Sequence, residues 1–452
     1  MNSVASERTE ELTKAGEAHF WPHVHVAGDL SSDSGIKLVD RAEGPWVYDM
    51  AGDRWFDTLA SLWCTNVGHG RTEIAEAAAD QLKRMAFSPE GTVAASTVEL
   101  TSKLASMAPD PGSRVFLSSG GSEAVETAIK MAKNYQRNIG EPSRWKVISR
   151  RGSYHGATLA AMSLGGGGLT VPHKFGPLMP GNVRVAQVDG YRGVFGSGAE
   201  AARDVERAIV HEGPSTVAAV IAEPISASAG IHVPDDDYWP TLREICDKYG
   251  VVLICDEVLT GFGRTGKMFA IEHWGVTPDI LTGAKGLTSG YSPIGATLAT
   301  KKIADAFLPT DEEGFMHLFT FGGNPASSAI ALANLAIIEN EDLVANSAEM
   351  GRYLYDQIST LHDRYEVVGD VRGGLGLFAA IEFVKDRETK EKFDDDAGLG
   401  DLIRRQYSEH RLLGRGADVI FIAPPLTLTK NDVDFLVEHL EGIVAAVQDE
   451  LG

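Results

Sequence analysis

Short apolar runs alternate with segments of helical periodicity through the middle of the chain. The segment 71–87 places apolar residues at helical spacing. The apolar runs are continuous and rich in Val, Ile and Leu, as strands buried on both faces are, and they lie at 114–118, 146–150, 217–224, 251–258, 279–284 and 295–300. Strands that alternate with helices predict a mostly parallel sheet covered on both sides, which is the α/β class.

The two ends of the chain have a different pattern. Residues 47–58, "VYDMAGDRWFDT", hold two short alternating runs divided by a turn, which predicts an antiparallel hairpin. Residues 326–365 predict one long helix, strands broken by glycine follow at 367–383, and a last helix is expected from about Asp432. The run "GGGG" at 165–168 predicts a flexible loop.

These patterns divide the chain into three parts. We expect an N-terminal segment at 1–65, a large domain at 66–330 and a C-terminal segment at 331–452, with the two end segments making a small α+β domain. A length of 452 residues is consistent with two or three structural units.

Composition and charge narrow the class of protein. The chain is 43% apolar and 23% charged, as ordinary globular proteins are. Its net charge of −22 argues against nucleic acid or an anionic membrane as partner. Three scattered cysteines form neither a disulfide framework nor a CxxC metal motif. With no apolar run long enough for a secretory signal or a membrane span, we expect a cytoplasmic protein.

A glycine-rich turn follows the first apolar strand. Residues 114–118 lead into "SGGS", which ends with Gly120, Gly121 and Ser122, and a helix is expected next. Glycines at such a turn let backbone N–H groups converge, and a helix N-terminus favours an anion, so a phosphate can bind here. Ser122 is expected to cap the helix. The alternative is a plain tight turn with a serine cap.

Two charged residues are placed so that they can meet at one edge of the sheet. The run "VVLIC" ends in Asp256 and Glu257, and Lys285, in "DILTGAKGLTSG", follows one helix and one strand later. Asp256 could pair with a cationic ring nitrogen of a ligand, and a desolvated lysine is a usable amine nucleophile. Glu257 is expected to face away, because strand side chains alternate. The alternatives are a metal ligand or ion pair for the acids and a snorkelling lysine. No nearby His or Cys completes a metal site.

An aromatic residue is expected at the same edge. Tyr154 and His155 follow the strand at 146–150, so the tyrosine ring could stack on a flat cofactor. The alternative is a core tyrosine with a satisfied hydroxyl.

Together these stretches resemble the class III aminotransferases, the ω-amino acid and amine:pyruvate transaminase group of fold-type I pyridoxal-phosphate enzymes. The likeness runs in order through "LASLWCTNVGHG", "DEVLTGFGRTG", "AKGLTSGYSPIGA", "HLFTFGGNP" and "IAPPLTLT". The resemblance implies a large domain with a mostly parallel seven-stranded sheet, a small α+β domain, pyridoxal 5'-phosphate as cofactor and a homodimer or tetramer with shared active sites.

The resemblance also implies roles around the cofactor. Lys285 resembles the lysine that forms a Schiff base with the cofactor and later moves a proton, and Asp256 the acid that keeps the ring nitrogen protonated. The other residues that match cofactor-binding positions are Gly120, Gly121 and Ser122 at the phosphate, Tyr154 and Val258 on the two ring faces, His155, Glu223 near the cofactor hydroxyl, and Thr320, which reaches the phosphate in the neighbouring subunit. Gly120 stands where the family often has Ser or Thr.

Substrate-binding positions follow from the same resemblance. Leu62, Trp63 and Tyr154 match the pocket wall, and Arg415 matches the mobile arginine that clamps the substrate carboxylate. Here "RGAD" is one residue shorter than the usual motif. The implied reaction is a ping-pong transfer of an amino group from an amine or ω-amino acid to an oxo acid, with pyruvate as the expected acceptor. A decarboxylase or aminomutase, and an inactive binding homologue, are the alternatives.

Overall fold

The computed structural model describes residues 2–25, 27–31, 35–166, 172–307 and 314–452. Gly167 and Gly168 of the predicted loop lie outside the described residues. The chain forms two compact units: a large unit, Thr72–Ala348, and a small unit made of Met1–Arg71 and Glu349–Gly452.

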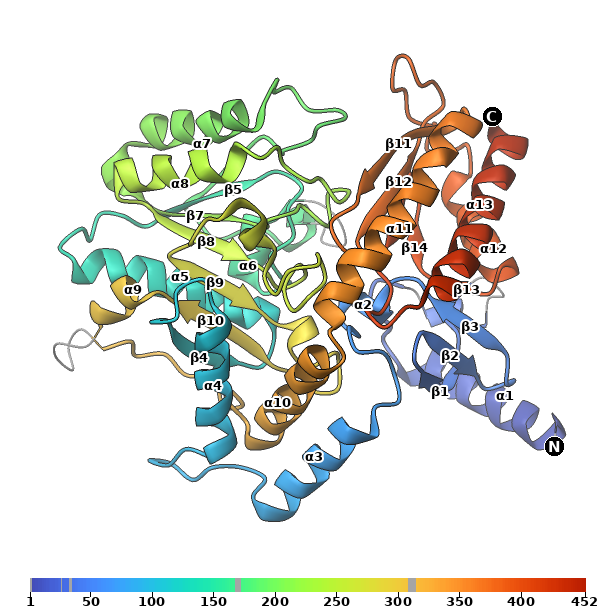
Figure 1. The fold of residues 1–452 in the computed structure, drawn as a ribbon, viewed down its shortest axis with the longest axis horizontal. Coiled ribbons are helices and arrows are strands. Elements are labelled where there is room, and N and C mark those ends of the chain that lie inside the picture. The colour runs from blue at the N-terminus through green and yellow to red at the C-terminus, as the bar shows by residue number, and fades with distance from the viewer. Residues whose placement is uncertain (1, 26, 32–34, 167–171, 308–313) are drawn as a thin grey trace. The chain divides into compact units, whose positions relative to one another are not determined.

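The large unit is built on a seven-stranded sheet in the order β4-β10-β9-β8-β7-β5-β6 (Figure 1). Neighbours among β5 to β9 are parallel, and β10 runs antiparallel to both β4 and β9. The strands are β4 (Arg114–Ser118), β5 (Lys146–Arg150), β6 (Asn182–Val185), β7 (Val217–Ala222), β8 (Val252–Asp256), β9 (Ile280–Gly283) and β10 (Gly295–Ala299). The predicted mostly parallel α/β sheet is confirmed. Strand β6 was not predicted, because its sequence "NVRV" is short and half polar.

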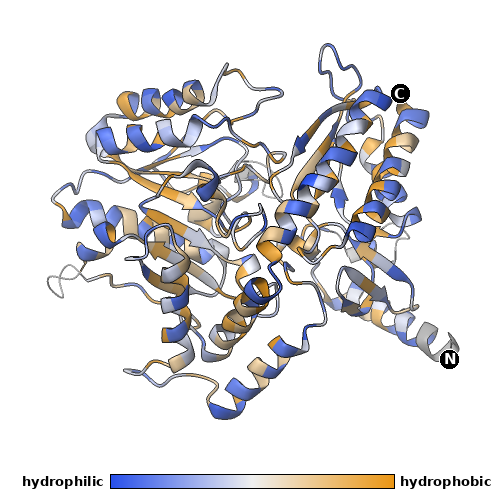
Figure 2. Cartoon of the chain, in the orientation of Figure 1, coloured by the Kyte–Doolittle hydropathy of each residue, from blue (hydrophilic) through white to orange (hydrophobic). Residues whose placement is uncertain are grey.

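Helices cover both faces of this sheet. Helix α5 (Gly121–Asn138) packs across β4 and β7 to β10, and its buried residues, among them Val125, Ala128 and Ala132, recur at helical spacing. Figure 2 shows largely hydrophobic strands beneath helices with one polar side. The large unit also contains the helices α3 (Thr72–Arg84), α4 (Ala95–Met107), α6 (Leu159–Leu164), α7 (Gly198–Glu212), α8 (Tyr238–Tyr249) and α9 (Lys301–Asp305).

The long helix predicted at 326–365 is wrong as a single element. The structure has α10 (Pro325–Asn340) and α11 (Leu343–Arg364), with Asp342 in the left-handed region at φ 51° between them. A residue in that conformation cannot continue a right-handed helix. The domain boundary expected after residue 330 falls inside α10, which packs on α3 and α4, whereas the two units divide within α11.

The small unit draws on both ends of the chain. One sheet contains β1 (Val39–Glu43), β2 (Trp46–Asp49), β3 (Arg54–Asp57) and β13 (Leu412–Leu413), and β2 and β3 confirm the predicted hairpin. A second sheet contains β11 (Val368–Gly373), β12 (Ala379–Phe383), β15 (Val419–Ile422) and β14 (Arg415–Gly416). Besides most of α11, this unit contains α1 (Asn2–His19), the short α2 (Ala60–Trp63), α12 (Leu399–Glu409) and α13 (Lys430–Leu451).

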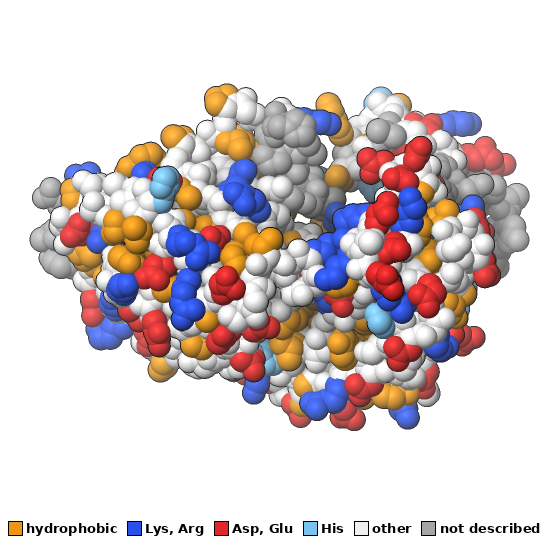
Figure 3. All heavy atoms as spheres, turned by 90° about the horizontal axis from the view of Figure 1, so that it is seen from above, with side chains coloured by type: hydrophobic (Ala, Val, Ile, Leu, Met, Phe, Trp, Pro, Cys, Tyr) orange, Lys and Arg blue, Asp and Glu red, His pale blue; other side chains and the backbone are white. Residues whose placement is uncertain are grey.

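The surface carries charges of both signs. On the face in Figure 3, acidic, basic and apolar side chains are interspersed. Among the described residues, no helix is long and apolar enough to cross a membrane.

Candidate functional site

The candidate site is a cavity of about 390 Å³ in the large unit, at the carboxyl ends of the parallel strands and the start of α5. Open α/β sheets bind ligands at this edge, and the volume is in the range of small-molecule sites. The cavity brings together most of the predicted cofactor-binding residues: Gly120, Gly121, Ser122, Tyr154, His155, Glu223, Asp256, Val258 and Lys285.

Asp256 is a buried carboxylate at the end of β8. Its Oδ1 accepts hydrogen bonds from Val258 N at 3.1 Å and from Thr282 Oγ1 at 3.0 Å. Its Oδ2 lies 2.7 Å from Nδ1 of His155, whose side chain is fully buried. These partners fix the carboxylate in place, while its lone pairs outnumber the three protein partners. Asp256 can therefore hold one more donor from the cavity.

Lys285 lies on the next strand connection. Asp256 and Thr282 are register partners in the parallel pair of β8 and β9, and the chain reaches Lys285 three residues later. Lys285 is half-buried and has φ of +35°, an uncommon conformation for a side-chain-bearing residue. Such strain clusters at functional sites. The amine and the carboxylate thus line one cavity from adjacent strands.

The start of α5 differs from the expectation in one detail. Gly120 occupies the N-cap position with extended backbone and makes no side-chain cap. Ser122 lies in the first turn, and its Oγ accepts a hydrogen bond from Ala157 N at 3.0 Å, so the predicted serine cap is wrong. The first N–H groups of a helix have no intrahelical partner, and here they begin at the cavity wall. An anion can bind there.

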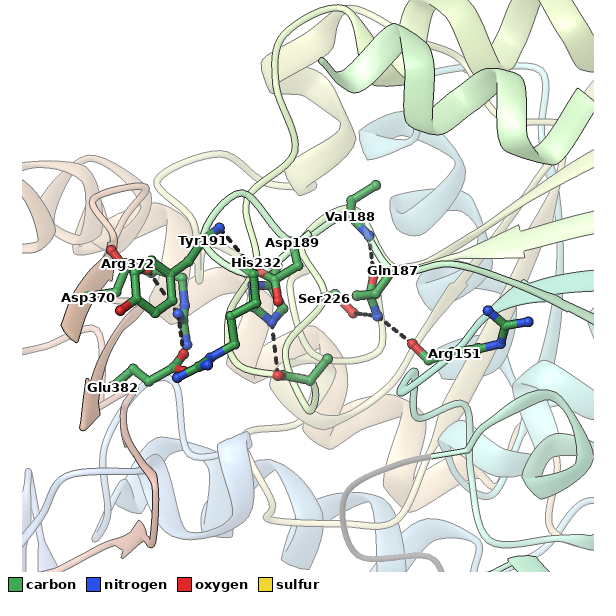
Figure 4. Close-up of polar contacts among 12 residues, drawn as sticks. Arg151, Gln187, Val188, Asp189, Tyr191, Ser226, His232, Asp370, Arg372 and Glu382 are labelled. Carbon is green, nitrogen blue, oxygen red and sulfur yellow. Dashed lines mark hydrogen bonds and ion pairs between the residues drawn. The ribbon is translucent and has the colours of Figure 1, made fainter. Parts of the chain in front are cut away.

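Glu223 follows β7 and is held by a chain of hydrogen bonds, of which Figure 4 draws the outer link between Gln187 and Ser226. Ala227 N donates to Oε2 at 3.2 Å, and Ser226 Oγ donates to Oε1 at 3.4 Å. Gln187 Nε2 in turn donates to Ser226 Oγ at 2.8 Å. Burial raises the pKa of Glu223, although His155 and Arg150 oppose the shift. A protonated Glu223 could donate to an oxygen of a ligand.

Tyr154 and Glu257 both follow strands of the sheet, but only Tyr154 lines the cavity. Tyr154 lines the cavity, and burial and then the charge of Asp256 raise the pKa of its hydroxyl. Glu257 turns the other way, where it accepts hydrogen bonds from Thr260 Oγ1 and from Ile271 N. Burial raises the pKa of Glu257 to about 7. Glu257 therefore belongs to the core beneath the site.

Four predicted residues do not line this cavity. Thr320 is exposed in the large unit. Leu62, Trp63 and Arg415 belong to the small unit, where Trp63 packs edge-on against Phe421 at 5.5 Å and the Arg415 guanidinium lies 5.9 Å from the same ring. Trp63 and Arg415 therefore share a contact with Phe421 within their own unit, whereas Leu62 is exposed.

Two polar residues near the cavity were not predicted. Arg150 is 2% exposed at the end of β5, and its Nη2 donates to the carbonyl oxygen of Glu223. An arginine that ends an apolar strand is a signal that could have identified it. Thr282, the partner of Asp256, lies in the same stretch as Lys285 and could have been found only from the strand register.

Comparison with known proteins identifies the family. The profile of the family Aminotransferase class-III matches residues 30–444. A putrescine–pyruvate aminotransferase of Pseudomonas aeruginosa is 37% identical over 97% of this chain and 96% of its own. An (S)-enantioselective omega-transaminase from Thermomicrobium roseum is 40% identical, with a TM-score of 0.91 over 98% of this chain and 99% of its own. A PLP-bound amine transaminase from an uncultivated Pseudomonas species is 39% identical, with a TM-score of 0.87 over 91% of this chain and 95% of its own. The chain belongs to the class III aminotransferases.

The enzyme is therefore a transaminase, and its cofactor is pyridoxal phosphate. The cavity fits this group. Asp256 suits a cationic ring nitrogen, and the start of α5 suits a phosphate. His155 Nε2 is buried and without a hydrogen-bond partner among the described residues, as a group beside a bound ligand would be.

Gly121→Ala tests the close approach of α5 to the cavity. A Cβ at Gly121 would lie 2.7 Å from Cγ1 of Val258, a stiff β-branched side chain. Overpacking of this kind costs about 1–3 kcal/mol, so we expect the Kd for pyridoxal phosphate to rise about tenfold or more. Titration of the apoenzyme with cofactor measures this. In Gly120→Ala the new Cβ meets no heavy atom within 4 Å, so a Kd raised equally by both variants would contradict the steric explanation.

Proposed function

We propose that this transaminase moves an amino group from an amine or ω-amino acid donor to an oxo acid, with pyruvate as the acceptor, in two half-reactions at the cavity of the large unit. The observation that carries the proposal is the meeting of Lys285 and Asp256 in one cavity with the start of α5. Pyruvate is supported by the name of the Pseudomonas aeruginosa relative. An amine donor is supported by the name of the amine transaminase from an uncultivated Pseudomonas species.

The residues divide the chemistry as follows. Pyridoxal phosphate, when bound, supplies a carbonyl carbon that amines attack and a ring that withdraws electrons. Lys285 would hold the cofactor through Nζ and, once the donor amine has taken its place, would carry a proton to and from the substrate carbon. Asp256 would hold the proton on the ring nitrogen, and the N–H groups of Gly121 and Ser122 would bind the phosphate.

The remaining residues orient the ring. Tyr154 and Val258 would hold the ring between them, and Glu223 and His155 would contact its polar groups. All four residues line the same cavity, which supports these assignments.

We also propose a homodimer in which Thr320 reaches the phosphate bound by the partner subunit. Thr320 lies in a strip whose side chains alternate: His317 and Phe319 are partly buried, whereas Met316 and Leu318 are 91% and 82% exposed. Phe321, next to Thr320, is 63% exposed and contacts Phe87, which is also exposed. An apolar strip of this kind is suited to cover by a second copy of the chain.

A panel of donors tests the proposed reaction. Diamines, ω-amino acids, taurine and aryl amines are each added to the purified holoenzyme, with pyruvate or 2-oxoglutarate as acceptor. We expect the visible band of the bound cofactor to fall with a productive amine and to return with pyruvate. A holoenzyme whose band responds to no amine, or returns only with 2-oxoglutarate, would contradict the proposal or its acceptor.

Arg415→Ala should affect the acceptor more than the donor. Burial lowers the pKa of the Arg415 guanidinium from its ordinary value, and among the described residues no carboxylate pairs with it. A charged hydrogen-bonded contact is worth about 1.5–3 kcal/mol, so we expect the KM for the oxo acid to rise about 10- to 100-fold. The kcat/KM for a neutral aryl amine should change little, and steady-state kinetics with both substrates checks this. Equal losses for both substrates would remove Arg415 from carboxylate recognition.

A further inference from the structure

The chain makes a strained turn directly after β3. We call residues 58–64 the 58–64 turn; it includes α2 and carries Leu62 and Trp63. Ala60, Ser61 and Trp63 have φ of 45°, 60° and 63°, and Ser61 has ψ of −96°. Backbone of this kind costs free energy in residues with a side chain and persists only where the surroundings over-determine it. Something in the small unit must hold the turn.

The carboxylate of Asp57 holds it. Asp57 is 2% exposed, and its Oδ1 accepts hydrogen bonds from Leu59 N at 3.2 Å and Ser61 N at 2.9 Å. Oδ2 lies 2.7 Å from Ser61 N and 3.1 Å from Nε2 of His69. A buried carboxylate needs such donors, and hydrogen bonds to a charged acceptor are stronger than neutral ones. The strained amide of Ser61 is therefore fixed by one side chain.

The same strand pair supports Arg415. Residues Asp57 and Leu413 are partners in the parallel pair of β3 and β13. Thr58 N and Thr58 Oγ1 both donate to the carbonyl oxygen of Leu413, at 2.9 Å and 3.0 Å. Arg415 follows two residues later in β14. The turn and the arginine therefore start from one pair of strands.

Aromatic contacts connect the 58–64 turn to the strands beside Arg415, and we call the pair β3 and β13 together with these contacts the frame. The Trp63 ring packs edge-on against Phe378 at 5.9 Å and Phe421 at 5.5 Å. Phe421 is also the strand partner of Arg415. Leu62, in contrast, is 59% exposed at the tip of the turn. A shift of the turn would move Leu62 and Trp63 relative to Arg415.

We propose that Asp57, with His69 as its partner, is a positioning residue that sets donor selection by holding the 58–64 turn. Asp57 does not touch substrate; it fixes the wall formed by Leu62 and Trp63 on the frame that carries Arg415. The inference rests on the proposed function for the substrate roles of these three residues. A misplaced wall should weaken the use of a bulky amine more than that of alanine, because only the bulky side chain fills the space beside it.

Hydrogen exchange of the holoenzyme tests the structural half of the proposal. In Asp57→Ala we expect amides in 58–64 to exchange at least about tenfold faster than in the wild type, with little change elsewhere. Asp57→Asn, which keeps one acceptor oxygen, should show a smaller effect and carries the test if the alanine variant does not fold. Asp49→Asn is the matched control, because Asp49 likewise accepts hydrogen bonds from backbone amides, Ala51 N and Asp53 N, in the same unit. Exchange in 58–64 that is no faster than in this control would overturn the proposal.

Kinetics test the functional half. In the Asp57 variants we expect the ratio of kcat/KM for 1-phenylethylamine to that for alanine to fall about tenfold, with the visible cofactor band unchanged. Adding Ser61→Gly should restore part of the ratio, because glycine adopts the backbone of Ser61 without strain. Faster exchange with an unchanged ratio would overturn the role in donor selection. If the wild-type band responds to no amine, the proposed function fails, and the exchange result still decides whether Asp57 holds the turn.

Discussion

Replacing Lys285 with alanine is expected to lower kcat at least about 10⁴-fold while the fold stays intact. The variant loses both the amine that binds the cofactor and the group that moves the substrate proton, and positioned proton transfer alone is worth up to about 10⁴-fold. The side chain lines a cavity and is half-buried, so its removal leaves the core packed. The measurements are kcat with the best donor and pyruvate, the visible band of bound cofactor, and thermal unfolding.

Lys285→Arg, with a control variant, separates the role of the Lys285 amine as a nucleophile from the role of its charge. Lys285→Arg keeps a cation in the cavity, but a guanidinium stays protonated and is a poor nucleophile, so we expect it to be as inactive as Lys285→Ala. Lys301→Ala is the matched control. It removes an exposed lysine of the same unit that pairs with Asp305, and surface ion pairs of this kind contribute little to stability. Activity retained in Lys285→Arg would show that Lys285 acts only as a charge.

Asp256→Asn is expected to lower kcat about 10²- to 10³-fold. Asparagine keeps an acceptor for Val258 N and Thr282 Oγ1, so the end of β8 should keep its shape. The negative charge is lost, and with it the stabilisation of a protonated ring nitrogen, and the oxygen beside His155 Nδ1 becomes an amide NH2 group. Preorganised electrostatic groups of this kind are worth about 10²- to 10³-fold in kcat. Steady-state kinetics of the fully loaded variant, with cofactor content checked by absorbance, measures the effect.

A second buried aspartate provides the control. Asp279 is 6% exposed, pairs with Arg243 at 2.9 Å and accepts a hydrogen bond from Leu253 N at 2.8 Å. Asp279 does not line the cavity. Asp279→Asn should therefore lower the unfolding temperature with little change in kcat. If Asp256→Asn loses no more activity than Asp279→Asn, the charge of Asp256 has no special role.

The sheet could be predicted where burial dominates the sequence. Strands β4 and β5 have the bounds of their predicted runs, because each is a short run of β-branched, aromatic and aliphatic residues with polar residues at its ends. The break between α10 and α11 could not be predicted in the same way. The residues around Asp342 keep a helical composition, and the break depends on one left-handed backbone conformation.

The candidate site could be predicted in part for a similar reason. Asp256 and Lys285 follow strands whose carboxyl ends share an edge, so sequence order alone placed them together. Thr282 and Gln187 depend on strand register and on contacts distant in sequence, which no local pattern reveals. The Ser122 hydroxyl likewise bonds a residue far along the chain rather than its own helix.

The most direct test of the central claim is one experiment on the purified holoenzyme, in which a productive amine is added without any oxo acid. A transaminase that works through Lys285 should convert one donor per active site and lose the visible cofactor band once. Adding pyruvate should then restore the band and allow a further round of donor conversion. The Lys285→Ala variant should show no such cycle. Repeated conversion of donor without an oxo acid would contradict the account and favour a decarboxylase or aminomutase on the same fold.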